Sequence, residues 1–482
     1  MSITGAMNTA ISGLAAASRG AAVVSNNLAN VLTEGYGRRE IDLAARGGGV
    51  GGVLVVGETR FTDTVLLTDR RSADAALARH GVAAAFFERV QSVMGEPGSD
   101  RSLDALVTAV ETGLVSAATQ PESVLLLEQT VEDLSRLTGR IAEVGEAIQT
   151  ERSRADAALA DSVTRLTADL ARLETINNDI RRNVLQGGNG GALLDEREAL
   201  IDRVSELVPV REVDRGNGVV ALMSQGGILM DGPAPIIGFA GTPLVTEFHS
   251  VEGGQLSGLS INGRPIDIDR ARHMLSGGAI SGLLAVRDSE GPAAMARLDA
   301  FARDLVERLA GPDVDPSRAA GAPGLLTDAG VRFDPSAETG LSRRIAVNAL
   351  VDPDMGGAAW RLRDGLGAAM PGDPGTTDGL KRLGAALARA GAALSPEAPE
   401  GMFTAAGLGA SIYSTLGIAR LATEADMAQA SARASAIEQG LQGRAVDSDA
   451  EMQRLLLIEQ AYAANARVVS AARQMLDQLM EI

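Results

Sequence analysis

The sequence predicts a mainly α-helical, elongated, multi-domain protein with a small inserted β module. Apolar residues recur at helical spacing over long stretches that contain no proline, and this period predicts long helices. Most of the short strand-like runs, separated by glycine and proline, lie in residues 209–275. Both ends of the chain also carry seven-residue repeats, which predict that the terminal helices pair as a coiled coil around a long-helix bundle in the middle.

The first predicted element is a helix that ends near Asn30, with Gly35 as the residue that tolerates a left-handed terminator. Its apolar residues follow the a and d positions of a heptad rather than the broader stripe of a surface helix. These positions are Met7, Ala10, Leu14, Ala17, Ala21, Val24, Leu28 and Val31.

The last predicted element is a helix from Val446 to Met480. Ser448 and Glu451 have the spacing of a capping box at its start. Periodicity alone also fits two core helices of one globular domain, so it leaves the partner of each seam open. The heptad positions of this helix are Leu455, Ile458, Tyr462, Asn465, Val469, Ala472, Leu476 and Leu479.

Between the two ends, residues 41–44 and 53–56 are predicted strands joined by a glycine-rich turn. That turn lacks the lysine of a phosphate-binding loop. The proline-free stretch 122–186 would span roughly 95 Å as one helix at 1.5 Å per residue, which suits a rod-shaped building block. Further helices are predicted at 72–94, 102–118, 193–207, 295–309, 380–394 and 405–441.

Residues 311–401 are rich in glycine, proline and aspartate, which leaves loops, a trimmed second module or partial disorder open. The strands of the β module are predicted at 219–223, 228–230, 245–248, 259–261 and 266–268. The predicted domains are a terminal coiled coil (1–33 with 446–482), a long-helix bundle (34–208 with 276–310 and 403–445), a β-rich insertion (209–275) and a variable segment (311–402).

Composition argues against several classes of partner. The 62 acidic and 44 basic residues give a net charge of −18, which disfavours nucleic acid and anionic membrane surfaces. The chain has no cysteine, so disulfides and thiol chemistry are excluded. The first helix resembles neither a signal peptide nor a membrane span, so we expect no membrane insertion and, if the protein is exported, a route without a cleaved leader.

No residue pattern indicates catalysis, a metal site or a cofactor. The three histidines lack a metal-ligand partner at helical or strand spacing. The acidic run 195–198 lies early in a helix, where a solvated face is the favoured interpretation. We therefore predict that the protein is not an enzyme and holds no cofactor.

Two signatures at opposite ends resemble one family. The stretch 26–39 reads NNLANVLTEGYGRR, and residues 449–480 read DAEMQRLLLIEQAYAANARVVSAARQMLDQLM. Both resemble the terminal signatures of flagellar rod, hook and hook-associated axial proteins. Between them, GGALLDEREALIDRVSELV and SGGAISGLLAVRD resemble the hook-associated members of this family, the hook–filament junction proteins.

The resemblance implies a structural adaptor between hook and filament, outside the cell on the bacterial flagellum. It implies self-assembly as a ring or helical oligomer, with the hook subunit below, a second hook-associated protein and the filament above, and a flagellar export chaperone. We expect both ends to be loosely ordered in the single molecule and to order on assembly. The expected assembly interface comprises Met7, Leu14, Val24, Asn27, Leu28, Asn30, Val31, Gly35, Tyr36, Leu455, Ile458, Tyr462, Asn465, Val469, Leu476 and Leu479.

Three alternatives remain from the sequence. A hook-type axial subunit would share the terminal signatures but be richer in strands between them. A secreted coiled-coil protein with an enzymatic module would need a carboxylate pair or metal cluster in its insertion. A cytoplasmic coiled-coil scaffold would not need the stretch 26–39 in this form.

Overall fold

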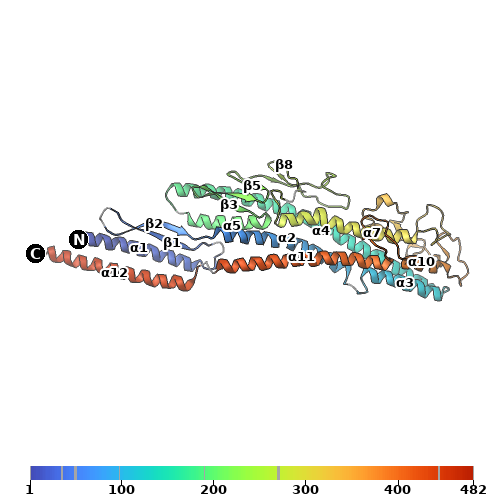
Figure 1. Cartoon of the computed structure of the whole chain (residues 1–482). Helices are drawn as coiled ribbons and strands as arrows, with labels where there is room; N and C mark the ends of the chain where they lie inside the picture. The colour runs from blue at the N-terminus through green and yellow to red at the C-terminus, as the bar shows by residue number, and fades with distance from the viewer. Residues whose placement is uncertain are drawn as a thin grey trace.

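A computed structural model of the chain describes residues 2–33, 36–47, 51–96, 98–188, 190–268, 272–442 and 446–480. The molecule is elongated and mainly helical, with small β-sheets along one side (Figure 1). Both chain termini lie at one end, and the helices α3 and α10 lie at the other. The structure therefore confirms the predicted fold class.

The terminal helices α1 (Ile3–Ala29) and α12 (Ser448–Met480) lie side by side at the end that carries the termini (Figure 1). The Ser2 side chain caps α1 by accepting the N–H of Gly5 at 3.1 Å. Asp447 caps α12, because its carboxylate accepts the N–H groups of Asp449 and Ala450. The predicted capping box headed by Ser448 is therefore wrong by one residue.

A hairpin of β1 (Arg39–Ala45) and β2 (Val53–Arg60) follows α1 and packs against it. Both strands are longer than predicted, and a bulge between Asp42 and Leu43 shifts their register. The Oγ atom of Ser12 accepts the N–H of Val53 at 3.1 Å, which ties the start of β2 to α1. Part of the predicted glycine-rich turn lies outside the described residues.

The middle of the molecule is a bundle around α4 (Val124–Leu185), a single helix of 62 residues. Its continuity agrees with the prediction from the proline-free stretch. Packed along it are α2 (Thr64–Met94), α3 (Leu103–Thr119), α5 (Gly191–Leu207) and α7 (Gly291–Leu309). Helix α11 (Ala405–Gln442) runs beside α2 (Figure 1).

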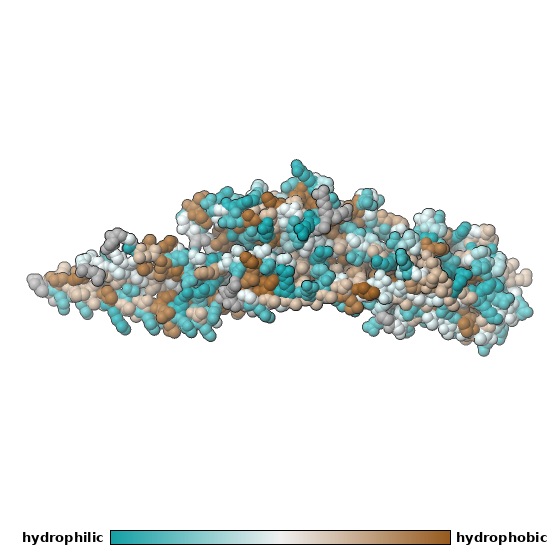
Figure 2. Space-filling view, in the orientation of Figure 1, coloured by the Kyte–Doolittle hydropathy of each residue, from teal (hydrophilic) through white to brown (hydrophobic). Residues whose placement is uncertain are grey.

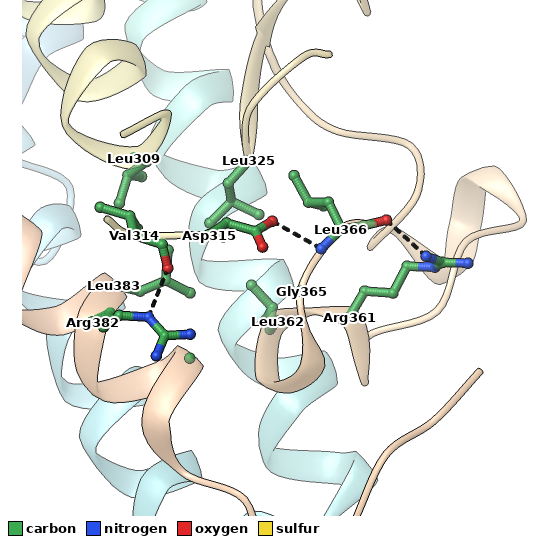
Figure 3. Close-up of a pocket in the computed structure, with 11 residues that line it drawn as sticks. Leu309, Val314, Asp315, Leu325, Arg361, Leu362, Gly365, Leu366, Arg382 and Leu383 are labelled. Carbon is green, nitrogen blue, oxygen red and sulfur yellow. Dashed lines mark hydrogen bonds between the residues drawn. The ribbon is translucent and has the colours of Figure 1, made fainter. Parts of the chain in front are cut away.

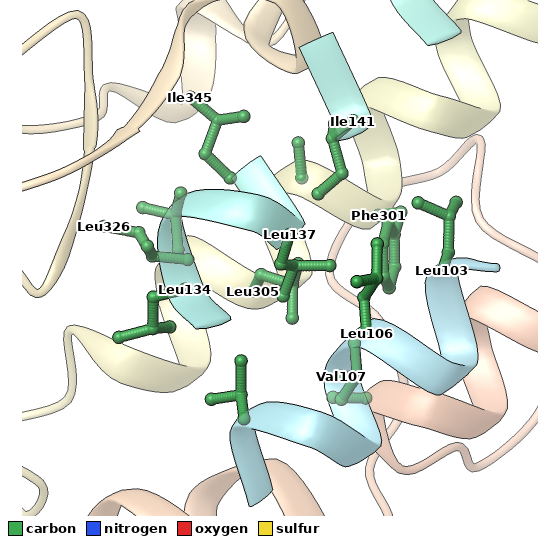
Figure 4. Close-up of a cluster of buried hydrophobic side chains, with 14 of the residues drawn as sticks. Leu103, Leu106, Val107, Leu134, Leu137, Ile141, Phe301, Leu305, Leu326 and Ile345 are labelled. Atoms are coloured by element: carbon green, nitrogen blue, oxygen red, sulfur yellow. The ribbon is translucent and has the colours of Figure 1, made fainter. Parts of the chain in front are cut away.

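Two hydrophobic clusters divide the length of α4. One surrounds its first half together with α3 and α7, as Leu137, Phe301 and Leu106 show in Figure 4. The other surrounds its second half with α5, α6 (Ala279–Ala285) and the β-strands. The single helix α4 thus contributes buried side chains to both hydrophobic clusters.

The β module consists of two three-stranded antiparallel sheets. Residues 245–248, a predicted strand, do not form one. Instead, Gln149 and the buried Arg152 of α4 donate to main-chain carbonyl oxygens of this segment, which holds it against the helix as a loop. The strands are β3 (Arg211–Gly216), β4 (Val219–Ser224), β5 (Gly227–Met230), β6 (Ile237–Gly238), β7 (Ser260–Ile261) and β8 (Arg264–Pro265).

The segment 311–402 is packed rather than loose. Its residues Leu326 and Ile345 enter the first cluster beside Leu134 and Ile141 of α4 (Figure 4). Its elements are short: β9 (Leu326–Asp328), α8 (Leu341–Arg344), β10 (Ile345–Val347), α9 (Arg361–Asp364) and α10 (Asp378–Ala388). Among the described residues, no helix is both long and apolar enough to cross a bilayer.

Candidate assembly interface

The seam between α1 and α12 is antiparallel and repeats every seven residues. Gly13 faces Asn465, Gly20 faces Ile458, and Asn27 bonds to Glu451. Each step of seven along α1 is thus matched by seven residues back along α12. A Cβ atom at Gly13 would lie 2.6 Å from the Asn465 side chain, and one at Gly20 would lie 3.2 Å from Ile458. The glycines therefore allow the two helices to approach closely.

This seam differs in part from the heptad predicted for α1. Of the predicted heptad residues, Ala10, Ala17 and Val24 are buried. In place of the predicted Leu14 and Ala21, however, the residues that face α12 are Gly13 and Gly20, each one position earlier in the chain. An alanine-rich helix has several stripes of apolar residues at heptad spacing, and the closest contact selects the one with the smallest side chains.

The other predicted interface residues have varied exposure in the single chain. Asn30 stays local, since its amide donates to the Asn26 carbonyl and its side-chain oxygen accepts from Thr33. Gly35 lies outside the described residues. Half-buried are Met7, Leu14, Leu28, Tyr36, Leu455, Ile458, Asn465 and Val469, whereas Val31, Tyr462, Leu476 and Leu479 are exposed.

A buried asparagine joins the two terminal signatures. The Asn27 amide nitrogen donates to the Arg39 carbonyl at 2.8 Å and to the Glu451 carboxylate at 3.2 Å. Its oxygen accepts from the Tyr36 hydroxyl at 2.8 Å and from the Arg39 N–H at 3.0 Å. All four hydrogen-bonding positions of the side chain are therefore occupied. Burial raises the pKa of the Tyr36 hydroxyl, which keeps it protonated as the donor.

Glu451 is the buried anion of this node. Besides Asn27, it accepts from Arg38 Nε at 2.8 Å, while Arg454 on the next turn pairs with Glu40 of β1. Glu451 therefore points into the contact with α1 and the hairpin, and does not return to the start of its own helix as a capping box would. The N-terminal and C-terminal signatures are two halves of one polar cluster.

A second set of ion pairs fixes the base of the hairpin to α5. Asp195 accepts from Arg60 Nε at 2.8 Å, from Arg39, and from the N–H of Gly37. Glu198 pairs with Arg60 at 2.8 Å. Burial raises the pKa of Glu198, against the opposing effect of its arginine partners. The predicted solvated face is therefore wrong for Asp195 and Glu198, because their partners come from residues more than 100 positions away.

These ion pairs continue into the bundle. The buried guanidinium of Arg71 on α2 donates to Asp202 of α5 and to Glu212 of β3, both at 2.7 Å. The Arg71 guanidinium also lies 3.5 Å from Glu198, which pairs with Arg60 of the hairpin. Buried charges of this kind are stable only when they are paired and hydrogen-bonded. The terminal pair of helices is thus attached to the bundle through oriented polar contacts.

An apolar groove of about 370 Å³ lies between α1, the hairpin and α12. Its floor is made of small α1 residues, including Ala16, Ala17 and Gly20. Ile41 and Leu43 of the hairpin form one wall, and α12 forms another. On the face shown in Figure 2, hydrophobic patches lie among hydrophilic ones along this terminal pair. The lining of the groove is mostly apolar, with Arg39, Glu40, Arg454 and Asn465 as its polar members.

Two further cavities lie away from the signatures. One void of about 20 Å³, room for roughly one water, lies between the end of α7 and the segment 311–402, including its helix α10 (Figure 3). Its charged residues bind the main chain: Asp315 accepts from the Leu366 N–H at 2.9 Å, and Arg361 donates to the Leu366 carbonyl at 2.8 Å. Arg382 does the same to Val314 at 3.0 Å. This void is a gap in side-chain packing.

A polar cavity of about 440 Å³ beside α2 contains His80 and His273. The Nδ1 atom of His273 accepts the Leu275 N–H at 3.3 Å, and burial lowers the pKa of this histidine. Within the described part of the chain, no group of three or more histidine, aspartate or glutamate side chains is placed to hold a metal ion.

Comparison with known families agrees with this architecture. A family model described as "Flagellar hook-associated protein FlgK helical domain" matches residues 87–310. One described as "Flagella basal body rod protein" matches residues 7–36. A third, "Flagellar basal body rod FlgEFG protein C-terminal", matches residues 438–482. The two end matches contain Asn27 and Glu451, which form the buried node.

Individual relatives are distant. Flagellar hook-associated protein 1 of Salmonella typhimurium (strain LT2) is 24% identical over 314 residues, which cover 61% of this chain and 55% of the relative. The Escherichia coli (strain K12) protein of the same name is 22% identical over 298 residues, 59% of this chain and 52% of the relative. The chain thus spans about half the length of the curated relatives it matches.

A solved structure of the flagellar hook junction protein FlgK from Burkholderia pseudomallei is also similar. It aligns with a TM-score of 0.44 at 17% identity, over 56% of this chain and 47% of that chain. The central match to the helical domain of a hook-associated protein thus lies between two matches to flagellar rod proteins, and the chain is similar to flagellar hook-associated protein 1.

Proposed function

We propose that the protein is a structural component of the bacterial flagellar axis that forms the hook–filament junction. In this role it is an adaptor that self-assembles through its terminal helices and catalyses no reaction. One observation supports this most strongly. The two signatures meet in a buried node, and the helices that carry them leave much of their apolar surface uncovered in the single chain.

Large apolar side chains are exposed on both terminal segments. Ile11, Val31 and Leu32 of the N-terminal segment are exposed, as are Leu457 and Leu479 of α12. A contiguous exposed apolar face normally marks an interaction site. Copies that join through two different faces extend into a ring or helical tube instead of closing a dimer. An adaptor needs such open ends in order to contact different neighbours below and above.

The proposed partners follow from this position. Copies of the chain itself lie beside each other, the hook subunit lies below, and a second hook-associated protein with the filament lies above. The protein works outside the cell, on the flagellum, and is exported with the help of a flagellar export chaperone. We propose that the terminal helices order fully only among neighbouring copies, since their small side chains bury little apolar area within one chain.

Deletion of the gene in its own bacterium tests the proposal. We expect hooks without filaments, with flagellin released into the medium, and restoration of filaments by the wild-type gene. Electron microscopy and a flagellin immunoblot of the medium measure both outcomes. Normal filaments in the deletion strain would refute the proposal.

Two substitutions test the role of the terminal pair. Leu28→Asp and Leu476→Asp should prevent complementation because each places a charge on a surface that must be covered in the assembly. Leu244→Asp is the matched control: Leu244 is also exposed, but it lies in the β module. All three proteins should be folded and exported, and only the control should restore filaments. Filaments in the Leu28→Asp strain would contradict the assigned interface.

A further inference from the structure

The polar cavity of about 440 Å³ lies between helix α2 and the β module, away from the terminal helices. Its walls are formed by α2, by the helix that runs from α6 into α7, and by the turn 273–277. Sites for small molecules usually have volumes of about 300–1,000 Å³. The cavity is therefore large enough for one small ligand.

One of the titratable side chains in the cavity wall has no counter-charge. Arg79 of α2 is exposed and forms no ion pair or side-chain hydrogen bond with any described residue. Its neighbour His80 has Nδ1 3.8 Å from the Asp426 carboxylate of α11. Asp288 is occupied by Arg287, whose Nε and Nη2 atoms donate to it at 2.7 and 2.8 Å. In a chain with a net charge of −18, the uncompensated charge at this cavity is thus positive.

The buried charges behind the wall balance one another. Arg287 is fully buried and also pairs with the buried Asp156 at 2.8 Å. Arg152, which is buried as well, donates to the Arg287 carbonyl at 3.0 Å. Two arginines are thus set against two aspartates, Asp156 and Asp288. This set adds no net charge that would cancel the charge of Arg79.

The ring of His273 is held as a neutral hydrogen-bond donor. Its Nδ1 atom accepts the Leu275 N–H at 3.3 Å, and burial lowers the pKa of the ring. Because Nδ1 accepts, the proton of the neutral ring lies on Nε2, which has no acceptor among the described residues. The turn is fixed in its own right, since Ser276 Oγ donates to the His273 carbonyl at 2.7 Å and Ser281 Oγ accepts the Gly277 N–H at 2.8 Å.

A π-helical turn, Val286–Glu290, forms part of the third wall. The Gly291 N–H donates to the Val286 carbonyl, five residues earlier, within the continuous helix from α6 to α7. Such turns are rare and occur frequently at functional sites. Asp288 and Ser289 of this turn line the cavity. The turn is therefore an observation, independent of the charges, that marks this cavity.

We propose that the cavity binds a small hydroxylated oxyanion, a sugar acid or a sugar phosphate. Arg79 pairs with the anionic group, and His273 Nε2 donates a second hydrogen bond to the ligand. Three neutral groups without a described partner, the side chains of Ser72, Gln225 and Ser289, bind the ligand hydroxyls. The site is separate from the terminal pair of helices and goes beyond the proposed function.

Calorimetric titration of the full chain at constant ionic strength tests the proposal. The probes are glucuronate and glucose 6-phosphate, with glucose as the neutral control. Arg79→Gln removes the unpaired cation. Arg101→Gln is the matched control, because Arg101 is also exposed and unpaired among the described residues but lies in the turn before α3. Thermal unfolding followed by circular dichroism verifies that both variants are folded.

We expect one site per chain for at least one of the two sugar anions and no binding of glucose. A preference for glucuronate would identify the anionic group as a carboxylate, and a preference for glucose 6-phosphate would identify a phosphate. Affinity should fall at least about tenfold in Arg79→Gln, the effect of losing roughly one charged hydrogen bond, and stay unchanged in Arg101→Gln.

Three results would overturn the inference: no saturable binding of either sugar anion at millimolar concentration, an equal loss of affinity in both arginine variants, or binding of glucose as tight as that of glucuronate. Each of them leaves the deletion phenotype, and therefore the proposed function, unaffected.

Discussion

Asn27 is the residue on which the attachment of the terminal helices depends most. A buried amide is stable only when its hydrogen-bonding groups are satisfied, and each unpaired group costs about 1–3 kcal/mol. Asn27 satisfies its groups with residues from the hairpin and from the far end of the chain. A leucine of similar size could not bind Glu451, which would lose a donor inside the contact. Both signatures are therefore needed for one local structure.

The first prediction concerns Glu451→Ala. Loss of the buried carboxylate leaves Arg38 and the Asn27 amide without their acceptor. We expect the contact between α1 and α12 to weaken by about 3 kcal/mol, the lower end of the range for removing one partner of a buried ion pair, because Arg38 is partly exposed. Hydrogen exchange should accelerate in both helices and stay unchanged in α4.

Glu459→Ala is the matched control, because Glu459 is exposed two turns further along α12. It should leave exchange in both helices unchanged. Equal protection in the Glu451→Ala variant and the wild type would show that the node does not hold the pair together.

The second prediction concerns Asp299 in the bundle. Burial raises the pKa of its carboxyl to about 6, although it accepts the N–H groups of Gly340 and Ser342 at 2.7 and 2.8 Å. Its ordinary value is 3.8, so the folded state binds the proton more tightly than the unfolded state. The stability that protonation contributes is therefore lost as pH rises through about 6.

Asp299→Asn should remove this dependence. From pH 7 to pH 5, Asp299 should add about 1 kcal/mol to the unfolding free energy of the wild type, and nothing to that of the variant. Urea titrations of both proteins at the two pH values measure the difference. Identical pH dependence in the two proteins would show that Asp299 does not carry this proton.

At this scale, the sequence could not reveal the partners. Glu451 has the spacing of a capping box and Asp195 the position of a solvated helix start, and both local interpretations were reasonable. The structure pairs them with arginines far away in the chain. One signal was visible: Gly13, Gly20 and Asn27 recur every seven residues. Small residues at heptad spacing indicate a close helix contact, although they do not identify the partner.

Among the elements, long helices were the most predictable. The proline-free stretch fixed α4 as one helix because no residue interrupts its hydrogen bonding. The segment 311–402 was not predictable, because its short elements depend on long-range contacts. Arg308 of α7, for example, donates to carbonyl oxygens of Arg389 and Phe403. Local sequence patterns cannot predict such hydrogen bonds, because the two partners lie far apart in the chain.

The third prediction concerns the close approach of α1 and α12. Gly13→Leu should separate the helices, because even a Cβ atom there lies 2.6 Å from Asn465. Overpacking of this kind costs about 1–3 kcal/mol. Hydrogen exchange in α12 should therefore accelerate. Adding Asn465→Ala should recover part of the protection by making room for the new side chain.

Ala15→Leu is the control for this substitution, since Ala15 is exposed on α1. It adds the same kind of side chain without meeting α12. If Gly13→Leu and Ala15→Leu had the same exchange rates, the glycine seam would not be the contact that sets the distance between the helices.

At the scale of the whole molecule, the bundle and the terminal pair of helices differ in how much large apolar surface they bury. Among the described residues, neither hydrophobic cluster includes a residue of α1 or α12. Large aliphatic side chains fill both clusters along α4, whereas glycine and alanine dominate the seam of the terminal pair. Each fully buried large side chain contributes about 1.5–3 kcal/mol, so the bundle holds most of the hydrophobic stabilisation. We therefore expect the bundle to stay folded when the contacts of the terminal pair are lost.

The last prediction follows from this division. A fragment of residues 64–442 keeps α2 to α11 and both clusters, and loses the hairpin and the terminal pair. Its denaturant midpoint should stay close to that of the full chain, because neither cluster loses a residue. The ion pairs lost are those of Arg39 and Arg60 with Asp195 and that of Arg60 with Glu198, and Glu198 keeps Arg71 as a partner. The fragment should also remain monomeric in sedimentation at concentrations where the full chain associates. A fragment that unfolds would place the stability of the bundle in the terminal helices, and a fragment that polymerises would place the assembly surface in the bundle.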